Sequence, residues 1–276
     1  MRILVTGSSG QLGGVICSML SRGHSIIGVD SAPGEHTSHL GDITDQEFIL
    51  SATKGAEIII HTCSLHAPHL KTHSCEEFIN TNIHGTLNLL KSAVENRVRR
   101  FIYTSTTSLY GHAMVSTERA VWVTEDLLPR PRDIYDITKI AAEGLCEIYA
   151  RQHALSCLSL RVSRYFLESD YLMAIYRLYR GVDVRDAANA HILAMGKEMD
   201  GYEVLNISAA SPFSKDETAD LLHDARGVLL LHFPNIEDAF ARRGWKLPRS
   251  IDRIYSIEKA QKWLHYRPQY NFDTLI

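Results

Sequence analysis

Apolar residues along the first half of the chain form short continuous runs that alternate with longer, periodic segments. "RILVT" is an apolar run that leads into glycines, "QLGGVICSMLSRG" repeats its apolar residues at helical spacing up to Gly23, and "SIIGVD" is a second apolar run. Strand, helix and strand in this order predict a βαβ unit. The alternation continues with strands predicted at "AEIIIHTC", "RRFIYTST" and "LSCLSLRVS", and helices predicted over residues 76–96 and 134–153.

Strands that alternate with helices indicate a parallel sheet covered on both faces, so we expect an α/β fold with a Rossmann-like, doubly wound sheet. Beyond about residue 164 the pattern weakens to a helical stretch near 184–199, a strand at "YEVLNIS" and a helix opened by "SKDE", where Ser214 and Glu217 fit a capping box. We therefore expect a Rossmann domain over residues 1–166 and, over residues 167–276, a mixed region with a small substrate-binding lobe.

The charge of the chain is nearly balanced, since 29 basic and 32 acidic residues give a net charge of −3. Nucleic acid is therefore not an expected partner. The N-terminal apolar run is too short for a signal peptide, and no stretch approaches the roughly 18 apolar residues of a membrane helix. Five cysteines without a C-x-x-C pair favour reduced thiols. We expect a cytoplasmic protein without a membrane segment.

A glycine-rich turn, "TGSSGQLGG", joins the first strand to the first helix. Gly7, Gly10 and Gly13 let the backbone approach a diphosphate, and the amides of the helix N-terminus point toward it. Asp30 closes the second strand, where a carboxylate accepts from ribose hydroxyls and repels a 2'-phosphate. No arginine follows in "DSAPGEH". The pattern favours NAD over NADP and makes residues 1–166 an NAD-binding domain; the alternative is an aspartate that merely starts a turn.

The stretch "DIYDITKIAAEG" places Tyr135 and Lys139 four positions apart on one helix face. A nearby ammonium favours phenolate over phenol and lowers the pKa of a tyrosine, which can then act as an acid or a base. Such a pair arises easily by chance, so the rest of the chain must support it.

Five motifs in order resemble the extended short-chain dehydrogenase/reductase family, in its NAD-dependent sugar epimerase/dehydratase branch. They are the glycine turn at 6–13, "GDITD" at 41–45, "NIHGTLNLL" at 82–90, "FIYTSTTSLYG" at 101–111 and "YDITK" at 135–139. The resemblance implies that Asp42 and Ile43 flank the adenine, that Asn82 lies near the catalytic centre, and that helices 76–96 and 134–153 form a homodimer interface. The implied cofactor residues are Gly7, Ser9, Gly10, Gln11, Leu12, Gly13, Asp30, Asp42, Ile43, Asn82, Tyr135 and Lys139.

The resemblance also assigns catalytic roles. Thr106 fills the position of the family's substrate-holding Ser or Thr, with Ser105 and Thr107 as neighbours at the substrate. Tyr135 transfers the proton while the nicotinamide accepts or returns the hydride at the same carbon, and Lys139 lowers the pKa of Tyr135 and binds the nicotinamide ribose. The alternative for the hydroxyls is that they only cap backbone at the end of a strand.

Two departures from the family pattern limit which reaction and which substrate we expect. The Asp and Glu that follow the catalytic Thr in the 4,6-dehydratases are replaced by Thr107 and Ser108, so dehydration lacks its acid and base. Arg164 replaces the Asn of the "LRxxN" pattern. A cation there either holds a carboxylate or phosphate of the substrate or lies at the surface.

Histidines and cysteines gather in "HTCSLHAPHLKTHSC", but their spacing fits no standard zinc site, so no metal is expected. We expect His61 to be a buried strand residue and the other members, His66, His69 and His73, to lie on a loop beside the nicotinamide.

Together these features predict an NAD-dependent oxidoreductase or epimerase acting on a secondary alcohol of a sugar or sugar acid. The segment between Arg161 and Asp186 is short, which favours a small substrate whose anionic group meets Arg164, Arg177 or Arg180. The alternatives are a nucleotide-sugar 4-epimerase with a rearranged nucleotide site, and a catalytically idle NAD-binding sensor or scaffold.

Overall fold

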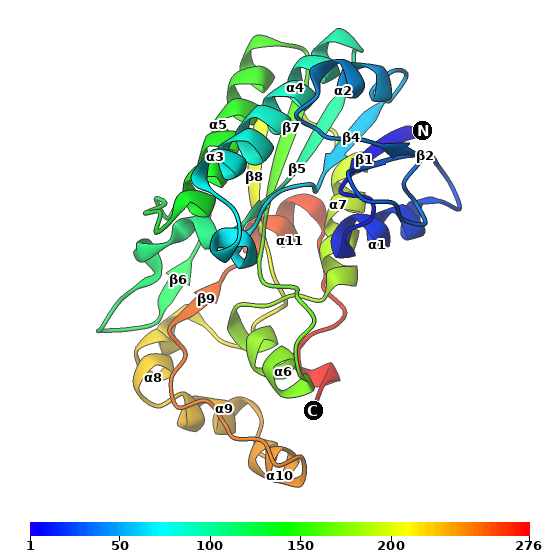
Figure 1. Ribbon diagram of the computed structural model, residues 1–276. Coiled ribbons are helices and arrows are strands. Elements are labelled where there is room, and N and C mark those ends of the chain that lie inside the picture. The colour runs from blue at the N-terminus through cyan, green and yellow to red at the C-terminus, as the bar shows by residue number, and fades with distance from the viewer.

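A seven-stranded parallel sheet forms the centre of the computed structural model, which describes residues 1–276 (Figure 1). Its order is β3-β2-β1-β4-β5-β7-β8. The chain builds outward from β1 to β3 and then crosses back to β4, so the winding direction reverses between β1 and β4, where ligands of such sheets bind. The strands are β1 (Arg2–Thr6), β2 (Ser25–Asp30), β3 (His39–Leu40), β4 (Ile58–His61), β5 (Arg100–Thr106), β7 (Ser156–Val162) and β8 (Tyr202–Ile207).

Helices cover both faces of the sheet, as a doubly wound fold requires. Side chains alternate along each strand, so that Ile3 and Val5 pack under one helical layer and Leu4 under the other. The first layer comprises α1 (Gln11–Leu20), α7 (Val184–Gly196) and α11 (Glu258–Leu264). The second comprises α2 (Gln46–Ala52), α4 (Gly85–Glu95) and α5 (Ile134–Gln152). The predicted fold class is confirmed.

The region predicted as one helix over 76–96 is instead three consecutive helical segments. They are α3 (Cys75–Phe78), a π-helical turn η2 (Ile79–His84) and α4. The wider turn brings Asn82 into the interior. There its Oδ1 accepts from the amide of Leu65, and its Nδ2 donates to the carbonyl of Leu65. A π-turn of this kind commonly marks a functional position in a helix.

The later part of the chain divides between two places. α7, β8 and α11 complete the sheet and its cover, while α6 (Asp170–Tyr179), α8 (Thr218–His223), α9 (Ala225–His232) and α10 (Ile236–Arg242) build a smaller lobe with its own apolar cluster. Figure 1 shows α8, α9 and α10 as a group apart from the sheet. The predicted capping box of Ser214 and Glu217 is present and opens the 3-10 turn η5 (Lys215–Glu217) before α8.

A second, two-stranded parallel sheet links the lobe to the main body. It pairs β6 (Val121–Val123) with β9 (Arg253–Tyr255). Val123 and Tyr255 pack with Leu109 and Met114, beside the end of β5. The remaining elements are short 3-10 turns: η1 (Ala67–Lys71), η3 (Thr107–Tyr110), η4 (His112–Met114) and η6 (Phe272–Thr274).

All five cysteines are free thiols. No helix of this fold combines the length with the apolar character that crossing a membrane requires.

Candidate active site

A cavity of about 840 Å³ opens at the carboxyl ends of the central strands, between the sheet and the lobe. Its walls come from the glycine turn, from the segments that follow β2, β4, β5 and β7, from the start of α5, and from α6 and β9. Most predicted cofactor residues line it: Gly7, Gly10, Gln11, Leu12, Gly13, Asp30, Asp42, Ile43, Tyr135 and Lys139. Ser9 and Asn82 are not among the lining residues.

The glycine turn has no room for a side chain at Gly7 or at Gly13. Gly7 has a φ of +73°, and a Cβ there would lie 2.6 Å from Thr62 Oγ1; a Cβ on Gly13 would collide with the carbonyl of Gly7. Gly10 begins α1 without a side-chain cap. The first amides of α1 therefore face the cavity without a protein cap, as an anion site at a helix N-terminus requires.

Asp30 ends β2 at the cavity rim. Its Oδ2 accepts from the amide of Ser9 (3.0 Å) and its Oδ1 from the amide of Ala32 (2.9 Å). The carboxylate thus both organises the turn and presents a fixed negative charge to the cavity. Ser9 acts on this carboxylate through its amide, and its hydroxyl donates to the carbonyl of Ala32 (2.7 Å).

Asn82 lies outside the cavity lining and holds one of its loops through hydrogen bonds. It is 1% exposed, and its Nδ2 donates to Thr138 Oγ1 (3.0 Å) as well as to the carbonyl of Leu65. Its effect on the site is to hold the loop after β4.

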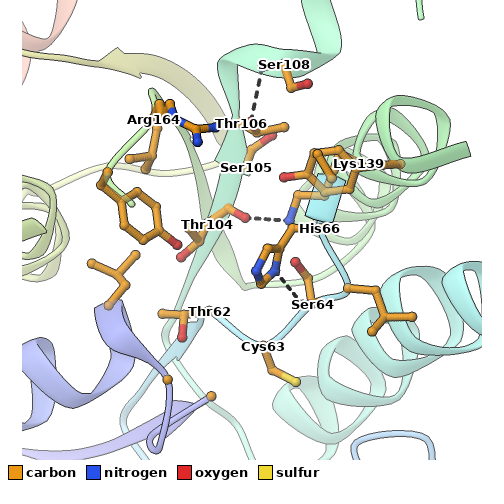
Figure 2. A pocket seen from close by; sticks show the side chains of 18 of the residues that line it. Thr62, Cys63, Ser64, His66, Thr104, Ser105, Thr106, Ser108, Lys139 and Arg164 are labelled. Carbon is orange, nitrogen blue, oxygen red and sulfur yellow. Dashed lines mark hydrogen bonds between the residues drawn. The ribbon is translucent and has the colours of Figure 1, made fainter. Parts of the chain in front are cut away.

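Tyr135, Lys139 and Thr106 meet at the end of β5. Tyr135 lies in the first turn of α5, whose N-cap Asp133 accepts from the amide of Asp136. Lys139, one turn later, donates from Nζ to the carbonyl of Thr104 (2.7 Å), and Thr106 Oγ1 accepts from the amide of Ser108 (3.1 Å) (Figure 2). The resemblance predicted this grouping, and all three side chains line one cavity.

Burial dominates the ionisation of this group. It raises the pKa of the Tyr135 phenol, and a hydrogen bond with Thr106 only partly opposes the rise. It also lowers the pKa of Lys139 to about 7, against the opposing influence of Glu143. This direction for Tyr135 is the opposite of the one expected from its spacing to Lys139, because loss of water is the largest influence and Tyr165, Asp136 and Asp133 act in the same direction.

The two neighbours of Thr106 differ in what they can offer a substrate. Ser105 donates its hydroxyl to Glu143 Oε1 (2.5 Å), and Glu143 in turn pairs with Arg161 (2.7 Å), so the Ser105 hydroxyl belongs to a buried network. Thr107 is 4% exposed and lines the cavity.

Of the three predicted anion-binding arginines, only two line the main cavity. Arg164 pairs with Glu168 and lies over the ring of Phe166, 5.0 Å from its centroid. Arg180 has no acidic partner and lies 4.3 Å from the ring centroid of Tyr176. Arg177 was a wrong expectation: it is buried in a salt bridge with Asp183 (2.8 Å) and does not line this cavity.

The first histidine of the histidine-rich segment is buried, as expected, and the later ones follow β4. His61 is 1% exposed in β4, where its Nδ1 bonds Thr6 Oγ1 (2.7 Å) and its Nε2 bonds Thr86 Oγ1 (3.0 Å). Burial lowers the pKa of His61 to about 3. His66 and His69 lie on the loop and turn that follow, and no three His, Cys, Asp or Glu side chains converge as a metal site.

The cavity also holds residues that the sequence did not indicate. Arg132 pairs with Asp136 (3.0 Å) and donates to Ser108 Oγ (2.7 Å), which ties the start of α5 to the segment after β5. Its place directly before the helix N-cap was an available signal. The other residues come from segments with weak patterns and carried none: Met114, Tyr165, Phe166, Tyr176, Arg253 and Tyr255.

Comparison with known proteins gives a consistent picture. Residues 3–173 match the model of the family described as NAD dependent epimerase/dehydratase family. The chain is 29% identical to a 3-beta-hydroxysteroid dehydrogenase from Mycolicibacterium neoaurum over 62% of this chain and 50% of that protein. It is 27% identical to an L-arabinose 1-dehydrogenase (NAD(P)(+)) from Haloferax volcanii over 58% of this chain and 66% of that protein. The chain thus spans half to two thirds of the length of these relatives.

Among solved structures, the fold is similar to that of UDP-glucuronic acid 4-epimerase from Bacillus cereus, in complex with UDP-glucuronic acid and NAD. The TM-score is 0.72 at 20% identity, and the alignment covers 100% of this chain and 96% of that one. At this identity the similarity concerns the fold.

Proposed function

Because the chain belongs to the NAD dependent epimerase/dehydratase family, we propose that it transfers a hydride between NAD and a secondary alcohol of a sugar or sugar acid. The observation that carries this proposal is the meeting of Tyr135, Lys139 and Thr106 in the cavity that the glycine turn also lines. One cavity therefore offers both a dinucleotide site and a proton-transfer site.

The residues present fit NAD, the cofactor of this family. The turn without room for a side chain at Gly7 or Gly13 and the free amides of α1 suit a diphosphate, and the fixed carboxylate of Asp30 suits ribose hydroxyls. Asp42 and Ile43 line the same cavity, and we assign them to the adenine. The charge of Asp30 is our reason for preferring NAD to NADP.

NAD, when bound, supplies the hydride acceptor or donor. The chain's own residues handle the proton and the substrate oxygen. Tyr135 gives its phenolic proton to a substrate carbonyl or takes one from an alcohol, and the Thr106 hydroxyl donates a hydrogen bond to the same oxygen. Lys139 holds the ribose hydroxyls and adds a positive charge beside the phenol, against the burial that raises the pKa of Tyr135.

A small substrate fits this cavity better than a nucleotide sugar. The same space of about 840 Å³ must take the dinucleotide as well as the substrate. Arg180 lines it without an acidic partner, so a sugar acid would find a cation there. The relative named L-arabinose 1-dehydrogenase supports a free sugar, whereas the structural neighbour that holds UDP-glucuronic acid supports the alternative, a nucleotide-sugar 4-epimerase.

An idle NAD-binding scaffold is the less favoured alternative. Lys139 is 2% exposed and has a pKa near 7, so its burial costs the folded state free energy. A protein that only binds the cofactor does not need an amine buried this deeply.

A substrate screen with added NAD tests the proposal. Purified protein is mixed with L-arabinose, D-galacturonate, D-glucuronate or UDP-glucose, and NADH absorbance and chromatography of the sugars are followed. Either NADH formation or sugar interconversion is expected, and Tyr135→Phe should abolish it. Binding of NAD without turnover of any substrate would favour the scaffold.

We also propose a homodimer through α4 and α5. Ile137 and Ile148 are 49% and 47% exposed on α5, and large apolar side chains at this exposure on one helix are suited to a helix-to-helix interface. Light scattering should give twice the chain mass, and Ile148→Glu should reduce it to that of one chain.

A further inference from the structure

His66 is an imidazole held rigidly at the cavity wall. It precedes the turn η1, and its ring stacks on Phe166 with centroids 5.5 Å apart. Its backbone amide donates to His69 Nδ1 (3.1 Å). The residue before it, Leu65, is bound at both its amide (2.8 Å) and its carbonyl (2.9 Å) by Asn82. The position of His66 is therefore set by the protein before any ligand binds.

The hydrogen bonds of the ring determine its tautomer. Nδ1 lies 3.1 Å from the carbonyl oxygen of Ser64, which can only accept (Figure 2). Nδ1 must then carry the hydrogen, and in the neutral ring Nε2 is a bare acceptor. Burial lowers the pKa of His66, and nearby His69 and Lys139 act in the same direction, so the neutral ring persists at neutral pH.

Nε2 makes no hydrogen bond within the protein, although the ring lines the same cavity as Tyr135 and Thr106. Lys139 acts electrostatically on the His66 ring, and Figure 2 draws both side chains among those that line the cavity. Tyr135 and Thr106 serve the oxygen that reacts. Nε2 of His66 is therefore free to accept from a ligand in this cavity, and a hydroxyl next to the reacting carbon is such a donor.

We propose that His66 is a specificity-determining residue whose Nε2 accepts a hydrogen bond from a second substrate hydroxyl, adjacent to the one that is oxidised. The inference rests on the proposed hydride transfer and narrows its substrate class to vicinal diols, as in sugars. A sterol with a single hydroxyl leaves Nε2 facing apolar carbon, and an unpaired buried acceptor is a strong discriminator.

Two variants separate the acceptor from the shape of the ring. In His66→Gln the longer amide can place an acceptor near the position of Nε2. In His66→Asn the shorter amide can still donate to Ser64 but does not reach that far. His73→Gln is the control, because it lies on the same loop and does not line the cavity.

The kinetic test compares kcat/KM for L-arabinose, D-galacturonate, D-galactose, 2-deoxy-D-galactose and dehydroepiandrosterone, a steroid with one hydroxyl. We expect His66→Asn to lose about 10- to 100-fold with the preferred polyol, largely through KM, and His66→Gln to retain most of it. His73→Gln should match the wild type. Preference for the steroid, or full activity of His66→Asn with the polyol, would overturn the proposal.

A second measurement needs no substrate. Nitrogen NMR of imidazole-labelled protein, with the His66 signal assigned by its loss in His66→Gln, should show the proton on Nδ1. A proton on Nε2 would refute the assignment directly. Absence of turnover with every compound, together with the Nδ1–H tautomer, would instead count against the proposed hydride transfer.

Discussion

Replacing Glu143 with Gln should destabilise the fold by about 3–5 kcal/mol, the usual effect of removing one partner of a buried ion pair. Glu143 and Arg161 are 8% and 9% exposed at their side chains, and the Glu143 carboxylate accepts from Arg161 Nη2 (2.7 Å), from Arg161 Nε (3.0 Å) and from Ser105 Oγ (2.5 Å). The Gln amide offers one oxygen in place of two and turns its NH2 toward a donor. The guanidinium of Arg161 is then left charged and buried.

Thermal unfolding of Glu143→Gln, followed by circular dichroism, should show a Tm lower by roughly 6–20 °C, at about 2–4 °C per kcal/mol for a chain of this size. The matched control is Glu147→Gln, on the same helix, which breaks an i,i+4 pair with Arg151 whose side chains are 39% and 72% exposed. An exposed pair contributes less than about 1 kcal/mol. Equal Tm losses in the two variants would show that burial does not set the strength of these pairs.

Three further changes test the site. Tyr135→Phe should keep the fold and NAD binding but lose about 10²- to 10⁴-fold in kcat, since one proton-transfer group is gone; comparable turnover would remove Tyr135 from the mechanism. Asp30→Ala should weaken NAD and raise the relative affinity for NADP in fluorescence titrations, because the carboxylate accepts from ribose and repels phosphate; unchanged affinities for both would contradict this. Lys139→Met should raise the Tm at pH 6, and this gain should be smaller at pH 9. The pKa of Lys139 is near 7 in the folded state and about 10.4 in the unfolded state. The wild type therefore gains stability as the pH rises from about 7 toward about 10.4, and the advantage of the variant decreases. A gain independent of pH would mean that the amine stays charged in the folded state up to pH 9, so that burial does not lower its pKa.

The sequence predicted the sheet and its ligand edge well because both depend on local patterns. Buried parallel strands appear in the sequence as continuous apolar runs, and the spacing of its glycines identifies the glycine turn. The positions of Asp30 and Tyr135 in the fold therefore followed from the order of the elements. The π-turn around Asn82 was not predictable, because its helical periodicity differs little from that of an ordinary helix over one turn.

Side-chain partners explain most of what the sequence missed. Arg177 and Arg180 lie three positions apart with the same charge, yet only the first finds an aspartate within reach. Burial likewise decides the direction of the pKa shift of Tyr135, and the spacing to Lys139 carries no information about how much water the fold excludes. The sequence placed His66 on a loop but could not predict the stacking of its ring on Phe166, because that contact joins segments a hundred residues apart.

The pairing of β6 with β9 also determines when, during synthesis, the cavity can be completed. Tyr255 packs its hydroxyl against Met114 across 141 residues of chain, and both line the cavity. A ribosome therefore completes the glycine turn, the central strands and the Tyr135 helix long before the residues that close the substrate side emerge. During that interval the nascent chain already contains the elements that we assign to dinucleotide binding, but the wall of the cavity formed by β9 is missing. A segment synthesised 141 residues after Met114 completes this wall, so a chain arrested before β9 would carry the glycine turn and the Tyr135 helix with the cavity still open on that side.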